Sequence, residues 1–115
     1  MSQTEVEAVR EGRVLELTLR GPETRNSISP PVYREIQRHA IAAGEDPEVG
    51  AILLTGADGF FSSGGNVRAL MASREGTLAE VTANTDALNV MIKALRACPK
   101  PVVAAVEGGA AGAGV

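Results

Sequence analysis

The chain has 115 residues, of which 44% are hydrophobic and 22% are charged, with a formal net charge of −3 at pH 7. This composition is typical of one globular domain with a single core, and its acidic balance argues against a nucleic-acid-binding protein. No apolar run reaches the ~18 residues of a membrane span, the N-terminus lacks a signal-peptide pattern, and the single cysteine excludes an internal disulfide. We therefore expect a soluble, cytoplasmic protein with no membrane partner.

The N-terminal residues predict a β-hairpin. The apolar stretches Val6–Val9 and Val14–Leu19 flank Glu11-Gly12, which reads as the turn. In the second stretch the leucines alternate with polar residues, as in a strand that is buried on one face only.

A helix is predicted next. Ser29 is placed as an N-cap, and Pro30 and Pro31 are tolerated in the first helical turn. Apolar residues then recur at a spacing of four, so the helix should run to about Ala43 and stop at Gly44.

Two more strands are predicted at Ala51–Thr55 and Val102–Val106. Between them we expect a short helix from Arg68 to Arg74 and then a long helix, capped by Thr77, whose apolar stripe reaches Leu95. This order of elements indicates an α/β fold with largely parallel strands and helical crossovers.

Two glycine-rich stretches, Phe60–Arg68 and Gly108–Val115, each follow one of these apolar strands and lead into an expected helix start. A helix start carries N–H groups without intrahelical partners, and glycine lets a ligand approach the backbone closely. If the two stretches face one another, they could present two N–H donors to one oxygen, as in an oxyanion hole. The same spacing also fits tight packing or a phosphate site.

Other chemical signals are weak. The sequence has no Walker A pattern, no dinucleotide fingerprint in register and no His/Cys spacing of a metal site. A structural role is favoured over catalysis for His39, Cys98, Asp58, Ser62, Ser63 and Glu107.

Four segments resemble the enoyl-CoA hydratase/isomerase (crotonase) superfamily. Phe61–Val67 resembles its Phe-Cys-Ala-Gly-Ala-Asp-Ile/Leu segment, and Pro99–Gly114 resembles its Lys-Pro-Val-Ile-Ala-Ala-Val-Asn-Gly segment with the glycines that follow. Arg25–Ser29 resembles its Arg-Asn-Ala-Leu segment, and Val49–Gly56 resembles its Val-Arg-Ala-Ile-Val-Leu-Thr-Gly strand. The four segments occur in the family's order and span nearly the whole chain.

The resemblance implies an α/β spiral of ββα units, the ClpP/crotonase fold, assembled as a homo-trimer or hexamer. Residues 1–115 would form the N-terminal part of that domain. The sequence ends at Val115, within a Gly/Ala run where a helix should begin, so we expect a piece of a longer protein.

The resemblance also implies an acyl-CoA substrate whose thioester carbonyl is held by the backbone N–H groups of Gly65 and Ala113. Asn66 differs from the family's commoner Asp by lacking a charge. No metal and no separate cofactor are implied, because coenzyme A is part of the substrate. The implied substrate-binding residues are Arg25, Ser27, Ser63, Gly64, Asn66, Val67, Arg68 and Gly112.

The implied activity is that of a lyase of fatty acid metabolism, the hydration of a 2-enoyl-CoA through an enolate. The two glutamates that serve hydratases of this family would fall beyond Val115, so the isolated chain is expected to be inactive. Alternatives are an isomerase, a hydrolase, an enzyme for a ring-derived thioester such as oxepin-CoA, and a non-catalytic acyl-CoA-binding or assembly module.

Overall fold

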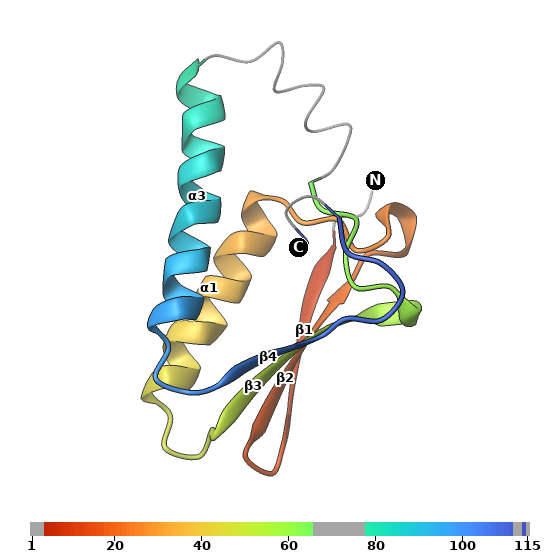
Figure 1. The fold of residues 1–115 in the computed structure, drawn as a ribbon. Helices are drawn as coiled ribbons and strands as arrows, with labels where there is room; N and C mark the ends of the chain where they lie inside the picture. Colours follow the sequence, from red (N-terminus) through yellow and green to blue (C-terminus); the bar gives the residue numbers. More distant parts are fainter. Residues whose placement is uncertain (1–3, 66–77, 112–113, 115) are drawn as a thin grey trace.

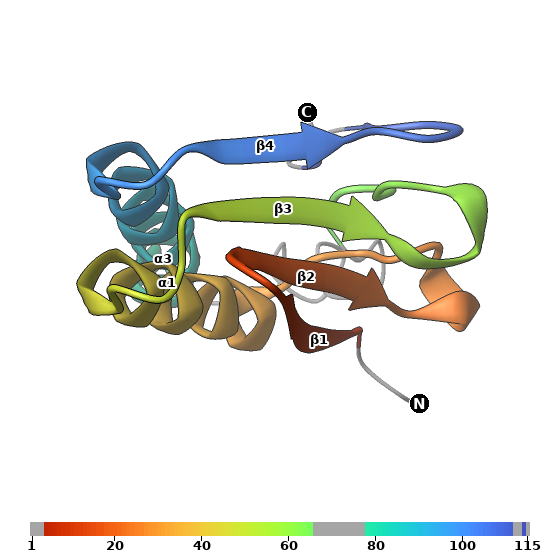
Figure 2. The same cartoon turned by 90° about the horizontal axis from the view of Figure 1, so that it is seen from below.

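Four strands form one sheet in the part of the chain that the computed structural model describes, residues 4–65, 78–111 and 114. The strands lie in the order β1-β2-β3-β4 (Figures 1 and 2). Their bounds are β1 (Glu5–Glu11), β2 (Val14–Arg20), β3 (Ala51–Gly56) and β4 (Val102–Ala105). β1 and β2 are antiparallel, whereas β2, β3 and β4 are mutually parallel.

The alternation of β2 sets which face of the sheet is buried. Leu17 and Leu19 are 0% and 2% exposed, while Thr18 between them is only half-buried. Leu17 is paired with Leu54 of β3, so both strands turn apolar side chains to the same face. The predicted hairpin and its alternation are therefore confirmed.

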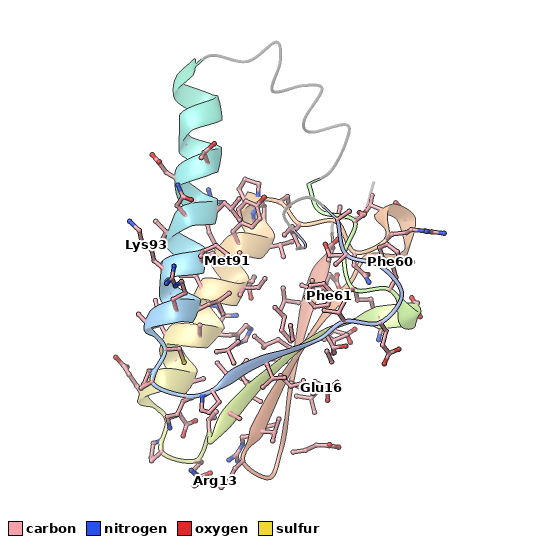
Figure 3. The ribbon with its side chains drawn as sticks, viewed as in Figure 1. Arg13, Glu16, Phe60, Phe61, Met91 and Lys93 are labelled. Carbon is pink, nitrogen blue, oxygen red and sulfur yellow. The ribbon has the colours of Figure 1, made fainter. Side chains whose placement is uncertain are left out.

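Two helices lie on that side of the sheet: α1 (Pro30–Glu45) and α3 (Leu78–Ala97), which pack side by side (Figure 1). Figure 3 shows Met91 directed from α3 toward α1, and Lys93 pointing away on the opposite side of the helix. The buried cluster between these layers consists of Leu19, Ile28, Val32, Tyr33, Ile36 and Met91. A second cluster, nearer the other end of α1, consists of Leu17, Ala43, Val49 and Ile52.

The α/β class with parallel strands is confirmed, and two boundaries differ from those expected. Helix α1 continues through Gly44 to Glu45 and is capped by the Asp46 N–H, which donates to the Ala43 carbonyl. Gly44 instead allows close packing, since a Cβ there would lie 3.0 Å from the Pro99 Cδ atom. Strand β4 ends at Ala105, which leaves Val106 outside the sheet. The expected Arg68–Arg74 helix and the Thr77 cap lie outside the described residues.

His39 lies in α1 with only 17% of its side chain exposed, and its Nε2 atom is 3.7 Å from Glu35 Oε2. Burial lowers the pKa of His39 below its ordinary value of 6.5, and Arg38 lowers that pKa further while Glu35 opposes the change. The neutral imidazole is thus the form that the fold favours.

We predict that Ile36 contributes far more to the free energy of unfolding than Ile41 on the same helix. Ile36 is 2% exposed within the core, whereas Ile41 is 51% exposed. Ile36→Ala should lower the free energy of unfolding by about 2–5 kcal/mol, and Ile41→Ala should change it by about 0.5 kcal/mol or less. Urea denaturation measures both, and equal losses would contradict this assignment of the core.

We also predict that His39 makes stability depend on pH. Because the folded state lowers the pKa of His39, the unfolded chain binds the proton more readily; stability is fully present above the ordinary pKa and falls as pH drops below it. His39→Gln should flatten the pH dependence of the unfolding midpoint between about pH 5 and 7. Glu35→Gln, which removes the opposing charge, should steepen it, and an unchanged slope in both variants would refute the assignment.

Candidate functional site

The segment Phe61–Gly65 lies against the chain that follows β4. The Ser62 N–H donates to the Gly109 carbonyl at 3.3 Å, and the Ala111 N–H donates to the Ser62 carbonyl at 3.0 Å. These bonds form an isolated parallel bridge between Ser62 and Ala110. The two glycine-rich stretches are therefore in direct contact at the carboxyl ends of the parallel strands.

The other side of the same segment contacts the loop before α1. The Ser63 N–H donates to the Arg25 carbonyl at 3.0 Å, and the Ser63 Oγ donates to the Thr24 carbonyl at 2.6 Å. Further along, the Ile28 N–H donates to the Gly64 carbonyl at 2.7 Å. Phe61–Gly65 is thus held between one segment from the N-terminal half and one from the C-terminal end.

The peptide that joins Gly64 to Gly65 has a defined orientation. Its carbonyl accepts the Ile28 N–H, and a trans peptide points its N–H in the direction opposite to its carbonyl. The Gly65 N–H is therefore directed away from Ile28. It donates to no group of residues 4–65, 78–111 and 114, and Gly65 is partly exposed.

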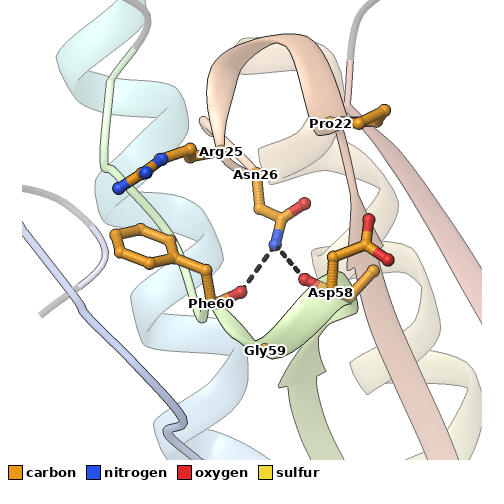
Figure 4. Close-up of a pocket in the computed structure, with 7 residues that line it drawn as sticks. Pro22, Arg25, Asn26, Asp58, Gly59 and Phe60 are labelled. Carbon is orange, nitrogen blue, oxygen red and sulfur yellow. Dashed lines mark hydrogen bonds between the residues drawn. The ribbon is translucent and has the colours of Figure 1, made fainter.

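The buried amide of Asn26 joins the loops around this segment. Asn26 is 2% exposed and adopts a left-handed backbone with φ of 59°. Its Oδ1 accepts the Gly21 N–H at 2.8 Å, and its Nδ2 donates to the Ala57 and Phe60 carbonyls at 3.0 and 2.6 Å. Figure 4 shows the two bonds that Nδ2 donates.

A cavity of about 410 Å³ opens beside Asn26 (Figure 4). The Arg25 guanidinium carbon lies 5.2 Å from the centre of the Phe60 ring, which is within cation–π range. Asp58 projects from the 3₁₀ helix η2 (Ala57–Gly59) at the other side of the cavity. The cavity thus combines a cation, an aromatic face and a carboxylate. Its lining residues are Pro22, Arg25, Asn26, Ala57, Asp58, Gly59 and Phe60.

The structure brings several of the expected site residues together. Ser63, Gly64 and Gly65 lie in the Phe61–Gly65 segment, and Arg25 lies in the loop before α1 that contacts it. Ser27 is nearby but 5% exposed, and its hydroxyl donates to the Thr24 Oγ1 at 2.7 Å, so it is already hydrogen-bonded inside the loop. The expected residues that lie outside the described part of the chain are Asn66, Val67, Arg68, Gly112 and Ala113.

Sequence reasoning did not single out Asn26 as an organising residue, and it assigned Ser62 only an unspecified structural role. Asn26 was visible only as part of an Arg-Asn-Ser segment, and its partners lie 31 and 34 residues away. An asparagine in a polar loop ahead of a helix is a signal for a left-handed turn, but no local pattern identifies such distant acceptors.

Two other kinds of site find no support in residues 4–65, 78–111 and 114. No group of three or more His, Cys, Asp or Glu side chains is placed there to hold a metal ion. No helix in the same ranges is both long enough and apolar enough to cross a membrane.

Comparison with known proteins gives consistent matches. The family model described as "Enoyl-CoA hydratase/isomerase" matches residues 9–115. The chain is 39% identical over 92 residues to "Probable enoyl-CoA hydratase echA17" of Mycobacterium avium, covering 78% of this chain and 34% of that protein. It is 30% identical over 102 residues to "1,2-epoxyphenylacetyl-CoA isomerase" of Escherichia coli, covering 88% and 39%.

Solved structures agree with these matches. The crystal structure of an enoyl-CoA hydratase from Polaromonas sp. JS666 superposes with a TM-score of 0.92 and 38% identity, over 95% of this chain and 42% of that one. This chain therefore spans about a third to two fifths of the length of the relatives named here.

We predict that the side chain of Asn26 is needed for stability. Asn26→Gly keeps the left-handed backbone but leaves the Gly21 N–H and the Phe60 carbonyl without a partner among the described residues, and the Ala57 carbonyl with only the Phe60 N–H at 3.5 Å. The free energy of unfolding should fall by at least about 2 kcal/mol, and Asn26→Ala should lose about 1 kcal/mol more because alanine resists a positive φ. Urea denaturation tests both variants. An unfolding midpoint of Asn26→Gly equal to the parent's would contradict this role.

Proposed function

The chain belongs to the enoyl-CoA hydratase/isomerase family, and we propose that the protein containing it is an enzyme that acts on an acyl-CoA thioester. The proposed reaction is hydration of a 2-enoyl-CoA. The Gly65 N–H is the first donor of an oxyanion hole, and the expected second donor is the N–H of Ala113. The substrate is proposed to carry the coenzyme A group itself, so no separate cofactor is needed.

The observation that carries this proposal is the orientation of the Gly65 N–H. The carbonyl of its peptide is held by Ile28, and the N–H points away from that bond, with no acceptor among the described residues. The contact between Ser62 and Ala110 keeps the second glycine-rich segment beside it. A preoriented, unoccupied backbone donor is what stabilisation of a developing oxyanion requires.

The chemistry follows from the conjugation of the substrate. Water adds its oxygen to C3, the electrons of the C2=C3 bond move onto the thioester oxygen, and C2 then takes up a proton. The backbone donors stabilise the enolate oxygen between these steps. We assign the acid and base for the proton transfers to residues other than those that the structure describes.

Arg25 and the cavity beside it are proposed to contact the coenzyme A part of the substrate. The guanidinium offers a fixed positive charge, and its position over Phe60 limits its rotation. Ser63, Gly64 and the expected residues 66–68 and 112 would line the acyl portion. A cytoplasmic homo-trimer or hexamer is proposed as the working assembly.

An isomerase that acts on a ring-derived thioester is the second candidate. The relative named 1,2-epoxyphenylacetyl-CoA isomerase covers 88% of this chain at 30% identity, so the described segment is shared with an enzyme named as an isomerase. Both reactions would use a polarised thioester carbonyl, and we assign the groups that separate them to residues outside the described part of the chain.

We predict that removal of the Gly65 N–H abolishes most of the activity of the full-length protein with crotonyl-CoA. Gly65→Pro should lower kcat by about 10²–10³-fold, because proline has no N–H to donate to the oxyanion. Gly65→Ala keeps the N–H and, because the positive φ in this turn belongs to Gly64, should retain a kcat close to the parent's. Loss of the enoyl absorbance measures the rate, and circular dichroism checks the fold.

The products distinguish the proposed reactions. Hydration adds the mass of one water to the thioester, whereas isomerisation leaves the mass unchanged. Tight binding of acyl-CoA without turnover of any enoyl or ring-derived thioester would instead support a non-catalytic binding module. A folded Gly65→Pro variant with the parent's kcat would overturn the oxyanion assignment.

A further inference from the structure

Ser62 lies at the centre of the contact between the two glycine-rich segments. Its side chain is completely buried, at 0% exposure. Its backbone forms both hydrogen bonds of the bridge to Gly109 and Ala111. A Cβ on Gly114 would lie 2.9 Å from the Ser62 Cβ and 3.1 Å from its Oγ. The glycine-rich segment after β4 therefore packs directly on the Ser62 side chain.

The Ser62 hydroxyl makes two hydrogen bonds of its own. The Oγ donates its proton to the backbone carbonyl of Asn26 at 2.7 Å, and it accepts the Gly64 N–H at 3.1 Å. A hydroxyl has one proton and two lone pairs, so the bond to Asn26 occupies its single donor and the bond from Gly64 occupies one of its two acceptor sites. If only the small size of the Ser62 side chain mattered, alanine would serve equally well and neither hydrogen bond would be needed.

The second of these bonds acts on the peptide next to the proposed oxyanion donor. Gly64 has a φ of 89°, a backbone conformation that glycine adopts freely. With its N–H fixed by the Ser62 Oγ and its carbonyl fixed by Ile28, both peptide planes of Gly64 are held. The direction of the Gly65 N–H is then set by the Ser62 Oγ and the Ile28 N–H.

We propose that Ser62 is a positioning residue whose hydroxyl, held by the Asn26 carbonyl, fixes the Gly64 peptide and thereby aims the Gly65 N–H at the thioester oxygen. This inference rests on the proposed function, since it assigns a role within the same oxyanion hole. It differs from a packing role because it makes the hydroxyl, and not the volume of the side chain, the feature that matters.

The test compares Ser62→Ala with Thr55→Val in the full-length protein. Each variant removes one hydroxyl that donates to a backbone carbonyl, but the Thr55 hydroxyl bonds Ala105 within the sheet. Ser62→Ala should lower kcat with crotonyl-CoA by about 10- to 100-fold, with KM and the affinity for free coenzyme A unchanged. Thr55→Val should leave kcat and KM as in the parent.

A binding measurement separates positioning from general loss of structure. Acetoacetyl-CoA can bind as an enolate, so Ser62→Ala should weaken its binding by about the same factor as kcat, while binding of free coenzyme A stays constant. A merely structural role would weaken both ligands or neither. Ser62→Cys keeps a weak donor and a weak acceptor and should give an intermediate kcat.

The outcomes are distinguishable. If the parent protein turns over no acyl-CoA, the proposed function fails and the role of Ser62 fails with it. If the parent is active and folded Ser62→Ala keeps the parent's kcat, or loses acetoacetyl-CoA and coenzyme A binding equally, only the role of Ser62 is overturned. Should Ser62→Ala not fold, Ser62→Cys decides, and a kcat equal to the parent's would overturn the inference.

Discussion

The buried amide of Asn26 is the interaction on which the arrangement of the loops depends. Its side chain bonds three backbone groups from two loops: the Gly21 N–H and the Ala57 and Phe60 carbonyls. The backbone carbonyl of the same residue accepts the Ser62 hydroxyl. Buried polar backbone is tolerated only when it is paired. Asn26 therefore lets irregular segments, rather than helices or strands, fill the carboxyl end of a parallel sheet.

The sheet and the site loops are stabilised differently. Leu17 and Leu19 hold β2 against the helices through burial of apolar surface, which depends on volume and pattern more than on direction. The Phe61–Gly65 segment is instead fixed by hydrogen bonds on both sides, and these are directional. A rigid apolar layer thus supports a polar layer in which the orientation of each peptide is defined.

This difference explains what the sequence could predict. The alternation in β2 and the spacing of four in α1 are local patterns, so the hairpin, the helix and the parallel strands followed from them. The boundary at Gly44 was wrong because the helix continues to Glu45 and is capped by the Asp46 N–H, which donates to the Ala43 carbonyl. The hydrogen bonds of Asn26 and Ser62 were missed because their partners are distant in sequence. The two glycine-rich segments were found from their position after apolar strands, and the family resemblance added the roles of individual residues. The role of Gly65 and Ala113 stays a prediction.

The long sequence separations within the site have a consequence for the order of folding. The bond from Ser62 to Asn26 closes 36 residues of chain, and the bridge to Ala110 joins a still more distant segment. Closing such loops costs entropy before any contact offsets it, and contacts distant in sequence slow the search for the native state. We expect the β1–β2 hairpin and α1 to form early and the glycine-rich segments to assemble last. The most precisely oriented part of the molecule would then be the final part to become ordered.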